Sequence, residues 1–173
     1  SGSAYDPEDK QGLANMAANI FNEGAVPGME PIDYMKRIEE LASEISFSVD
    51  EDYFFVNITC LTENIDNTLE LFARAIKNPD FTNDAIKRIR DGTVISIAKE
   101  DEKPEALAMK IFRENFFAGH PYSRNIKGKI EDVNKISRSD LLSFAKGHFS
   151  KQNIIISIAG NITKEEAGLK IDK

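Results

Sequence analysis

The chain has 173 residues, of which 41% are hydrophobic and 29% are charged, and its formal net charge is −7. Such a composition is ordinary for a globular protein with a sizeable core, and the absence of any basic run argues against a nucleic-acid partner. The sequence contains no apolar stretch of about 18 residues, which a membrane-spanning helix requires. Its single cysteine, Cys60, excludes an internal disulfide and a cysteine-rich zinc site.

The N-terminal third alternates between helical and strand periodicity. Apolar residues recur every three or four positions over 10–23 and over about 30–43, which predicts two helices. The period then changes to two, which predicts an antiparallel hairpin over 45–61 with one buried face and an exposed polar turn at 50–52. Cys60 falls on the apolar side of the second strand, and this position favours a buried structural thiol over a nucleophile.

Three further helices are predicted after the hairpin. Helical spacing over 64–77 predicts the first, and Pro79 lies just beyond its end. A longer helix is predicted over about 82–102, and Pro104 fits the first position of the next one, which extends to about Phe117. The apolar positions of the last two helices are Ile86, Ile89 and Ile97, and then Leu107, Ile111, Phe112 and Phe116.

The C-terminal part combines helix-capping signals with a strand. Two capping boxes predict helix starts: Ser137 with Asp140, for a helix to about 148, and Thr163 with Glu166. Between them, residues 154–159 form a nearly continuous β-branched run, which predicts an interior strand. We therefore expect an α+β fold of two layers, in which an antiparallel or mixed sheet packs against helices, with residues 1–173 forming a single domain.

Few polar residues are candidates for catalysis or metal binding. Asn15, Asn19 and Asn22 share one stripe of the first helix, which is typical of a solvated face or of a polar contact to a neighbouring strand rather than of a metal site. The two histidines, His120 and His148, lie in different elements, a turn and a helix end, and a structural role is expected for each. The sequence has neither a G-x-S-x-G elbow nor a glycine-rich phosphate loop.

Several blocks, taken in order, resemble the pitrilysin/insulinase-type zinc peptidases, and particularly their mitochondrial-processing-peptidase-like branch. The likeness covers about Gly2 to Ile162 and begins with the segment 2–14, which leads into the first helix. Its later blocks are 61–64 with the helix that follows, 78–81, 100–108, 120–122, 136–141, Phe149 and 153–161. The order and spacing of these blocks make the resemblance specific.

Members of this family carry the motif H-x-x-E-H on their first helix. Two imidazoles four residues apart share one helix face and can hold Zn²⁺ together, while the glutamate activates a bound water. The resemblance places Asn15 and Asn19 at the histidine positions, Ala18 at the glutamate and Ser96 at the family's remaining ligand, also a glutamate. Since none of these four side chains supplies the family's chemistry, we expect no catalytic residue and no metal ligand in this chain.

The resemblance implies a non-catalytic homologue of a zinc metallopeptidase, which acts as the partner or substrate-holding subunit of a two-part peptidase. A structural scaffold subunit, like the core proteins of a respiratory complex, is the alternative, and an active zinc metalloendopeptidase is the third reading. Zinc is expected only in a catalytic partner. The expected partners are a homologous zinc-bearing subunit, or a second half of the same protein, and an extended peptide.

Two further expectations concern the state of the chain. Halves of such peptidases are longer than this sequence, so we expect a truncated N-terminal half of a two-half protein. Uncovered sheet edges would then favour pairing between copies of the fragment. A bacterial periplasm or envelope is the first expectation for its location, and the mitochondrial matrix is the second.

Overall fold

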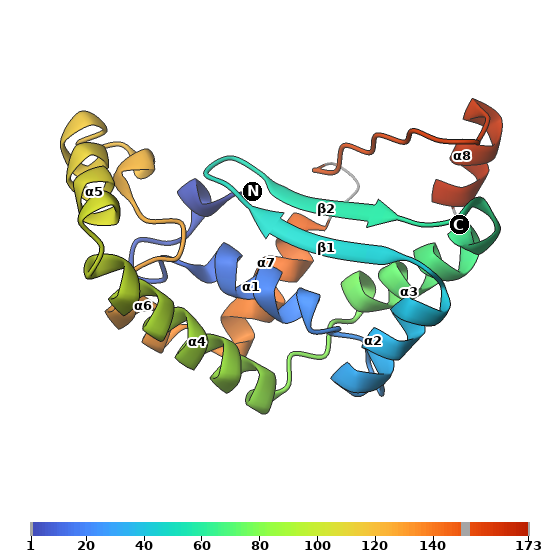
Figure 1. Ribbon diagram of the computed structural model, residues 1–173, viewed down its shortest axis with the longest axis horizontal. Coiled ribbons are helices and arrows are strands. Elements are labelled where there is room, and N and C mark those ends of the chain that lie inside the picture. The colour runs from blue at the N-terminus through green and yellow to red at the C-terminus, as the bar shows by residue number, and fades with distance from the viewer. Residues whose placement is uncertain (1, 150–152, 173) are drawn as a thin grey trace.

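The chain forms eight α-helices and one two-stranded hairpin within residues 2–149 and 153–172, which are the residues described by the computed structural model (Figure 1). The helices are α1 (Leu13–Asn22), α2 (Pro31–Glu40), α3 (Ile65–Lys77), α4 (Asn83–Asp101), α5 (Pro104–Phe116), α6 (Ile130–Lys135), α7 (Arg138–His148) and α8 (Lys164–Ile171). The strands are β1 (Glu44–Val49) and β2 (Phe54–Thr59), and short 3-10 turns occur at η1 (Ser3–Tyr5), η2 (Thr62–Asn64) and η3 (Pro121–Ser123). No described helix is long and apolar enough to cross a membrane.

The antiparallel hairpin packs its apolar face on α1. In the register of the two strands Ile45 faces Ile58 and Phe47 faces Val56, so alternate residues of β1 and β2 point to the same side. The ring of Phe21 on α1 stacks on Phe47, with ring centroids 4.9 Å apart. This contact lies at the centre of the main core, where α1 also packs against α4 and α7.

Asn22 fixes the end of α1 to the sheet. Its side-chain Oδ1 accepts a hydrogen bond of 2.8 Å from the Phe47 backbone N–H, and its Nδ2 donates one of 2.9 Å to the Phe47 carbonyl. Of the two readings left open for the polar stripe, a polar contact to a strand is therefore confirmed for Asn22. A smaller apolar cluster joins α2 to α3 and consists of Val26, Tyr34, Leu41, Leu71 and Ala75.

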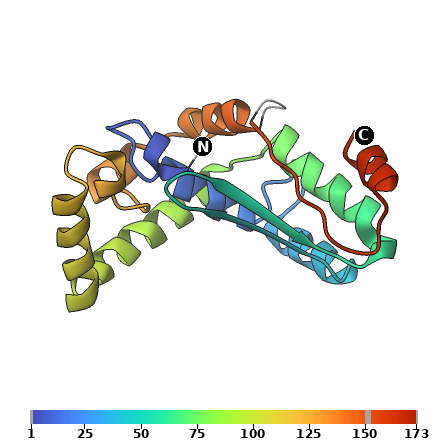
Figure 2. The same ribbon diagram turned by 90° about the horizontal axis from the view of Figure 1, so that it is seen from above.

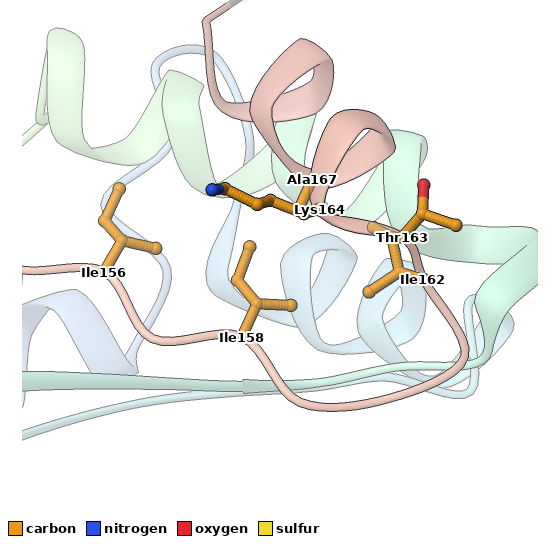
Figure 3. Close-up of a pocket in the computed structure, with 6 residues that line it drawn as sticks. All are labelled: Ile156, Ile158, Ile162, Thr163, Lys164 and Ala167. Atoms are coloured by element: carbon orange, nitrogen blue, oxygen red, sulfur yellow. The ribbon is translucent and has the colours of Figure 1, made fainter.

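The sheet is smaller than predicted. The expected α+β class and the antiparallel hairpin are confirmed, but the strand predicted over 154–159 is wrong. This run is extended, passes above β2 in Figure 1 and reaches α8 without joining the sheet. Ile156 and Ile158 point to the same side, into a hollow beside α8 (Figure 3). No described strand pairs with the run, and Ile155 is 89% exposed instead of buried.

The polar turn of the hairpin is half-buried, so its predicted exposure is wrong. The backbone N–H groups of Gly2 and Ser3 donate to the carbonyls of Asp52 and Asp50, both at 2.9 Å. The Tyr122 hydroxyl donates to the Asp52 carboxylate at 2.6 Å, and this bond raises the pKa of Tyr122 to about 12. Figure 2 shows the N-terminal segment beside this end of the hairpin. The turn is polar because it binds its neighbours, and not because it faces water alone.

Most predicted helices are confirmed within a few residues, including both capping boxes and Pro104 at the start of α5. The short helix α6 was not predicted. Cys60 follows the last residue of β2 and is only partly buried, so its predicted burial is confirmed in part. The helix α5 has no buried residue, and its apolar side chains stay exposed: Leu107, Met109, Ile111, Phe112 and Phe116.

Candidate functional site

The first helix begins at a buried carboxylate. Asp6 accepts hydrogen bonds from the backbone N–H groups of Gly12, at 2.9 Å, and Ala14, at 3.1 Å. These N–H groups have no partner inside the helix, so Asp6 supplies the cap that Gly12 lacks. Burial raises the pKa of Asp6 to about 6, although the bonds from the helix start and the nearby Arg124 act in the opposite direction.

A hollow of about 330 Å³ lies between α1 and α4. The helix α1 contributes two carboxamides, α4 contributes a guanidinium and two hydroxyls, and the loop before α6 contributes an ammonium. We call it the α1–α4 hollow, and it is lined by Asn15, Asn19, Arg88, Ile89, Gly92, Thr93, Ser96 and Lys127.

Two glycines bring the loop of Lys127 against the start of α1. Gly12 and Gly128 both have positive φ, of +96° and +81°. A Cβ on Gly128 would lie 2.0 Å from the Gln11 carbonyl oxygen, and one on Gly12 would lie 2.4 Å from the Lys127 carbonyl oxygen. Only glycine fits both the close approach and the left-handed backbone, and this approach places Lys127 at the hollow.

Lys127 forms a hydrogen bond with Ser96, the residue that the resemblance places at the distant zinc ligand. Its Nζ donates to the Ser96 hydroxyl at 2.8 Å and also to the Glu100 carboxylate one helical turn further along α4. Arg88, the second cation of the hollow, forms a two-pronged ion pair with Glu23 at 3.1 and 2.5 Å. The hollow is therefore lined by two cations, whose acidic partners are not among the lining residues.

Three of the four predicted positions meet at this hollow. Asn15, Asn19 and Ser96 line it, whereas Ala18 is buried in the core and 3% exposed. The Nδ2 of Asn19 donates to the Asn15 carbonyl at 3.0 Å. Their assignment as replaced zinc-site positions comes from the resemblance and stays a prediction.

Sequence reasoning missed Lys127, Arg88 and Thr93 as members of this site. Arg88 and Thr93 are separated from Ser96 by helical spacing, so placing Ser96 on the hollow could have revealed them. The histidines lie elsewhere, as expected: His120 Nδ1 accepts from the Tyr122 N–H at 3.2 Å, and His148 stacks on Phe144.

These residues do not fit a zinc ion. Carboxamides and a hydroxyl are poor ligands for Zn²⁺, which prefers thiolates, imidazoles and carboxylates. The Lys127 ammonium, hydrogen-bonded to Ser96, adds a cation beside one of the positions that the resemblance assigns to a zinc ligand. The arrangement is instead that of a polar hollow, in which two cations, two carboxamides and two hydroxyls supply hydrogen-bond donors.

Comparison with known families identifies the family of the chain. The family model described as "Insulinase (Peptidase family M16)" matches residues 1–129. The chain belongs to this family. The resemblance to insulinase-type peptidases predicted from the sequence is thus confirmed.

Relatives within the insulinase family have different roles. The chain is 20% identical over 166 residues to the mitochondrial-processing peptidase subunit beta of Dictyostelium discoideum, covering 96% of the chain and 35% of that protein. It is 21% identical over 164 residues to cytochrome b-c1 complex subunit 1 of Bos taurus, covering 94% of the chain and 34% of that protein. The chain thus spans about a third of the length of these relatives.

A solved structure shows the same fold. The crystal structure of a peptidase M16 inactive domain from Pseudomonas fluorescens superposes with a TM-score of 0.91 at 22% identity, covering 98% of this chain and 41% of that one. The insulinase-type fold of this chain is therefore shared with a protein described as inactive.

Proposed function

We propose that this chain is a non-catalytic member of the insulinase family, which serves as the partner or substrate-holding half of a two-part peptidase. The observation that supports the proposal is the donor set of the α1–α4 hollow. Asn15, Asn19 and Ser96 offer two carboxamides and a hydroxyl, and Lys127 holds Ser96 with an ammonium. The cleavage chemistry, and the zinc it requires, would be supplied by a homologous subunit or by a second half of the same protein.

The peptide would be held in an extended form along β2. Within the described residues β2 pairs with β1 alone, so its second edge keeps backbone groups that an added strand can bind. Addition of a peptide strand to such an edge gives affinity through main-chain hydrogen bonds. The formal net charge of −7 would favour basic peptides over acidic ones at long range.

The partner would cover apolar surfaces that the described residues leave open. Phe112 and Phe116 of α5 stack on each other at 5.2 Å, yet they are 50% and 69% exposed. The helix α5 lies at one end of the molecule, where Arg113 pairs with Glu51 of the hairpin turn at 2.8 Å (Figure 1). Since the chain spans about a third of its relatives' length, we assign α5 to contact with the remaining part of the peptidase.

A reconstitution assay tests this proposal. The purified chain is mixed with a family member from the same organism that carries an intact H-x-x-E-H motif, and cleavage of a basic extended peptide is measured for each protein alone and for the mixture. We expect a stable pair and cleavage well above that of the zinc-bearing protein alone, with no cleavage by this chain alone. Chelator-sensitive cleavage by this chain alone would contradict the proposal.

A scaffold subunit of a membrane redox complex is the second candidate, which the likeness to cytochrome b-c1 complex subunit 1 favours. Co-purification from the source cells separates the two: a zinc-bearing sister chain supports the peptidase, and redox subunits support the scaffold. For location, we propose the bacterial periplasm or envelope first and the mitochondrial matrix second. Pairing between copies of the chain is expected wherever no partner covers its edges.

A further inference from the structure

The α1–α4 hollow has an unusual set of lining groups for a chain with a formal net charge of −7. Its lining includes the cations Arg88 and Lys127 and no carboxylate. The remaining polar lining groups are the carboxamides of Asn15 and Asn19 and the hydroxyls of Thr93 and Ser96. Each cation is ion-paired with a carboxylate outside the lining, Arg88 with Glu23 and Lys127 with Glu100, so the hollow offers hydrogen-bond donors rather than an unbalanced positive charge. Such donors suit an anion or a polar oxygen better than they suit a metal ion.

Donor groups remain available in this hollow. An ammonium has three N–H donors, and within the described residues Lys127 uses two of them, on Ser96 and Glu100. A guanidinium has five, and Arg88 uses its Nε and Nη2 on Glu23. The Asn15 side-chain amide makes no hydrogen bond to another described residue, which leaves its Nδ2 as a further donor.

We propose that the α1–α4 hollow binds a carboxylate group of a peptide, with Lys127 as the main cationic contact and Arg88 as the second. A volume of about 330 Å³ accommodates a chain end or one acidic side chain. The proposal rests on the proposed function only in taking a peptide as the carrier of the carboxylate. Because the protein as a whole is acidic, the affinity must come from these local donors, and it should weaken with added salt.

Three peptides probe the site in the full chain. They are N-acetyl-trialanine with a free C-terminus, the same peptide as its C-terminal amide, and N-acetyl-Ala-Asp-Ala amide. Binding is followed by the NMR signals of the Asn15 and Asn19 side-chain amides and of the Gly92 backbone N–H. We expect at least one of the two carboxylate-bearing peptides to bind ten-fold or more tightly than the neutral amide. The comparison between those two distinguishes a chain end from an acidic side chain as the ligand.

Two variants should change the affinity of the site for a carboxylate in opposite directions. Lys127→Met keeps an unbranched side chain only one atom shorter and removes the charge, so we expect at least a ten-fold loss of affinity. Glu100→Gln removes the carboxylate that competes for the Lys127 ammonium, so we expect several-fold tighter binding. Lys110→Met and Asp101→Asn make the same charge changes in an exposed ion pair of 2.8 Å outside the hollow, and they should leave the affinity unchanged.

Several outcomes would overturn the carboxylate site. These are equal binding of the amide and both acids, no shift of the three NMR signals with any peptide, or unchanged affinity in Lys127→Met. If Lys127→Met does not fold, Glu100→Gln decides the matter, and binding no tighter than in the parent chain refutes the site. The reconstitution assay does not depend on Lys127, so the carboxylate site and the partner role can fail separately.

Discussion

The Nζ of Lys127 lies 2.8 Å from the Oγ of Ser96, and both residues line the α1–α4 hollow. This hydrogen bond joins the loop before α6 to α4. It also places a fixed positive charge among the three side chains that the resemblance assigns to a zinc site.

Restoring the zinc ligands should not be sufficient to restore zinc binding. The triple change Asn15→His, Asn19→His and Ser96→Glu supplies two imidazoles and a carboxylate. While Lys127 is present, its ammonium repels the metal and pairs with the new glutamate, so adding Lys127→Met should tighten zinc binding at least about ten-fold, or about 1.4 kcal/mol. Competition with a chromogenic chelator measures both affinities, and equal affinities would show that Lys127 does not oppose the metal.

The stability of the chain should depend on the protonation of Asp6. Its pKa is about 6 in the folded chain against an ordinary value of 3.8, because burial disfavours the carboxylate. Protonated Asp6 therefore adds on the order of 3 kcal/mol to the free energy of unfolding. This contribution is fully present below about pH 4 and is lost as the pH rises through 6. Urea unfolding at several pH values should show that Asp6→Asn removes this decline.

Asp140→Asn is the control for the Asp6 experiment. Burial acts to raise the pKa of Asp140, but hydrogen bonds from Lys10 and Ser137 outweigh it and hold the value at about 2. The Asp140 titration therefore lies below the window from pH 4 to 6, and this variant should keep the decline seen in the parent chain. A decline that persists unchanged in Asp6→Asn would show that another group causes it.

Gly128→Ala should destabilise the chain far more than Gly119→Ala. Both glycines have positive φ, of +81° and +79°, but a Cβ on Gly128 would meet the Gln11 carbonyl oxygen at 2.0 Å, whereas one on Gly119 meets nothing within 4 Å. We expect about 1 kcal/mol for Gly119→Ala from backbone strain alone, and roughly 2–4 kcal/mol for Gly128→Ala. Similar losses in chemical denaturation would mean that the loop does not pack closely against α1.

Asn22 and Asn15 share a stripe of α1 but should differ in their effect on stability. Asn22→Ala breaks two hydrogen bonds to the Phe47 backbone, so we expect a loss of about 1–3 kcal/mol. Asn15→Ala removes a side chain that lines the hollow and should change the free energy of unfolding by less than about 0.5 kcal/mol. A large loss in Asn15→Ala would place this residue in the fold rather than in the site.

Local signals predicted most of the fold because they act within a few residues. The capping box of Ser137 and Asp140 and the apolar spacing of α1 depend on neighbours in sequence alone. The prediction of a strand at 154–159 failed because strand formation depends on partners that are distant in sequence. The β-branched residues of this run favour an extended backbone, but a strand also requires a paired neighbour. Within the part of the chain that the structure describes, no strand pairs with the run. The hairpin turn likewise appeared exposed because its partners, Gly2 and Tyr122, are distant in sequence.

The candidate site could be predicted only in part. Helical spacing and the resemblance pointed to Asn15, Asn19 and Ser96, which do line one hollow. Nothing in the sequence marks Lys127 as part of that hollow. Its position depends on the close approach of Gly12 and Gly128, which are far apart in the chain. A contact of this kind arises from tertiary packing and leaves no periodic signal.

The zinc content of the purified chain tests the central claim most directly. The chain is saturated with zinc and desalted, its metal is measured by mass spectrometry, and hydrolysis of extended peptides is followed with and without a chelator. The fourfold variant that combines the restored ligands with Lys127→Met serves as the positive control for metal loading. We predict far less than one zinc per chain and no chelator-sensitive hydrolysis. One zinc per chain, together with hydrolysis that a chelator abolishes, would contradict it.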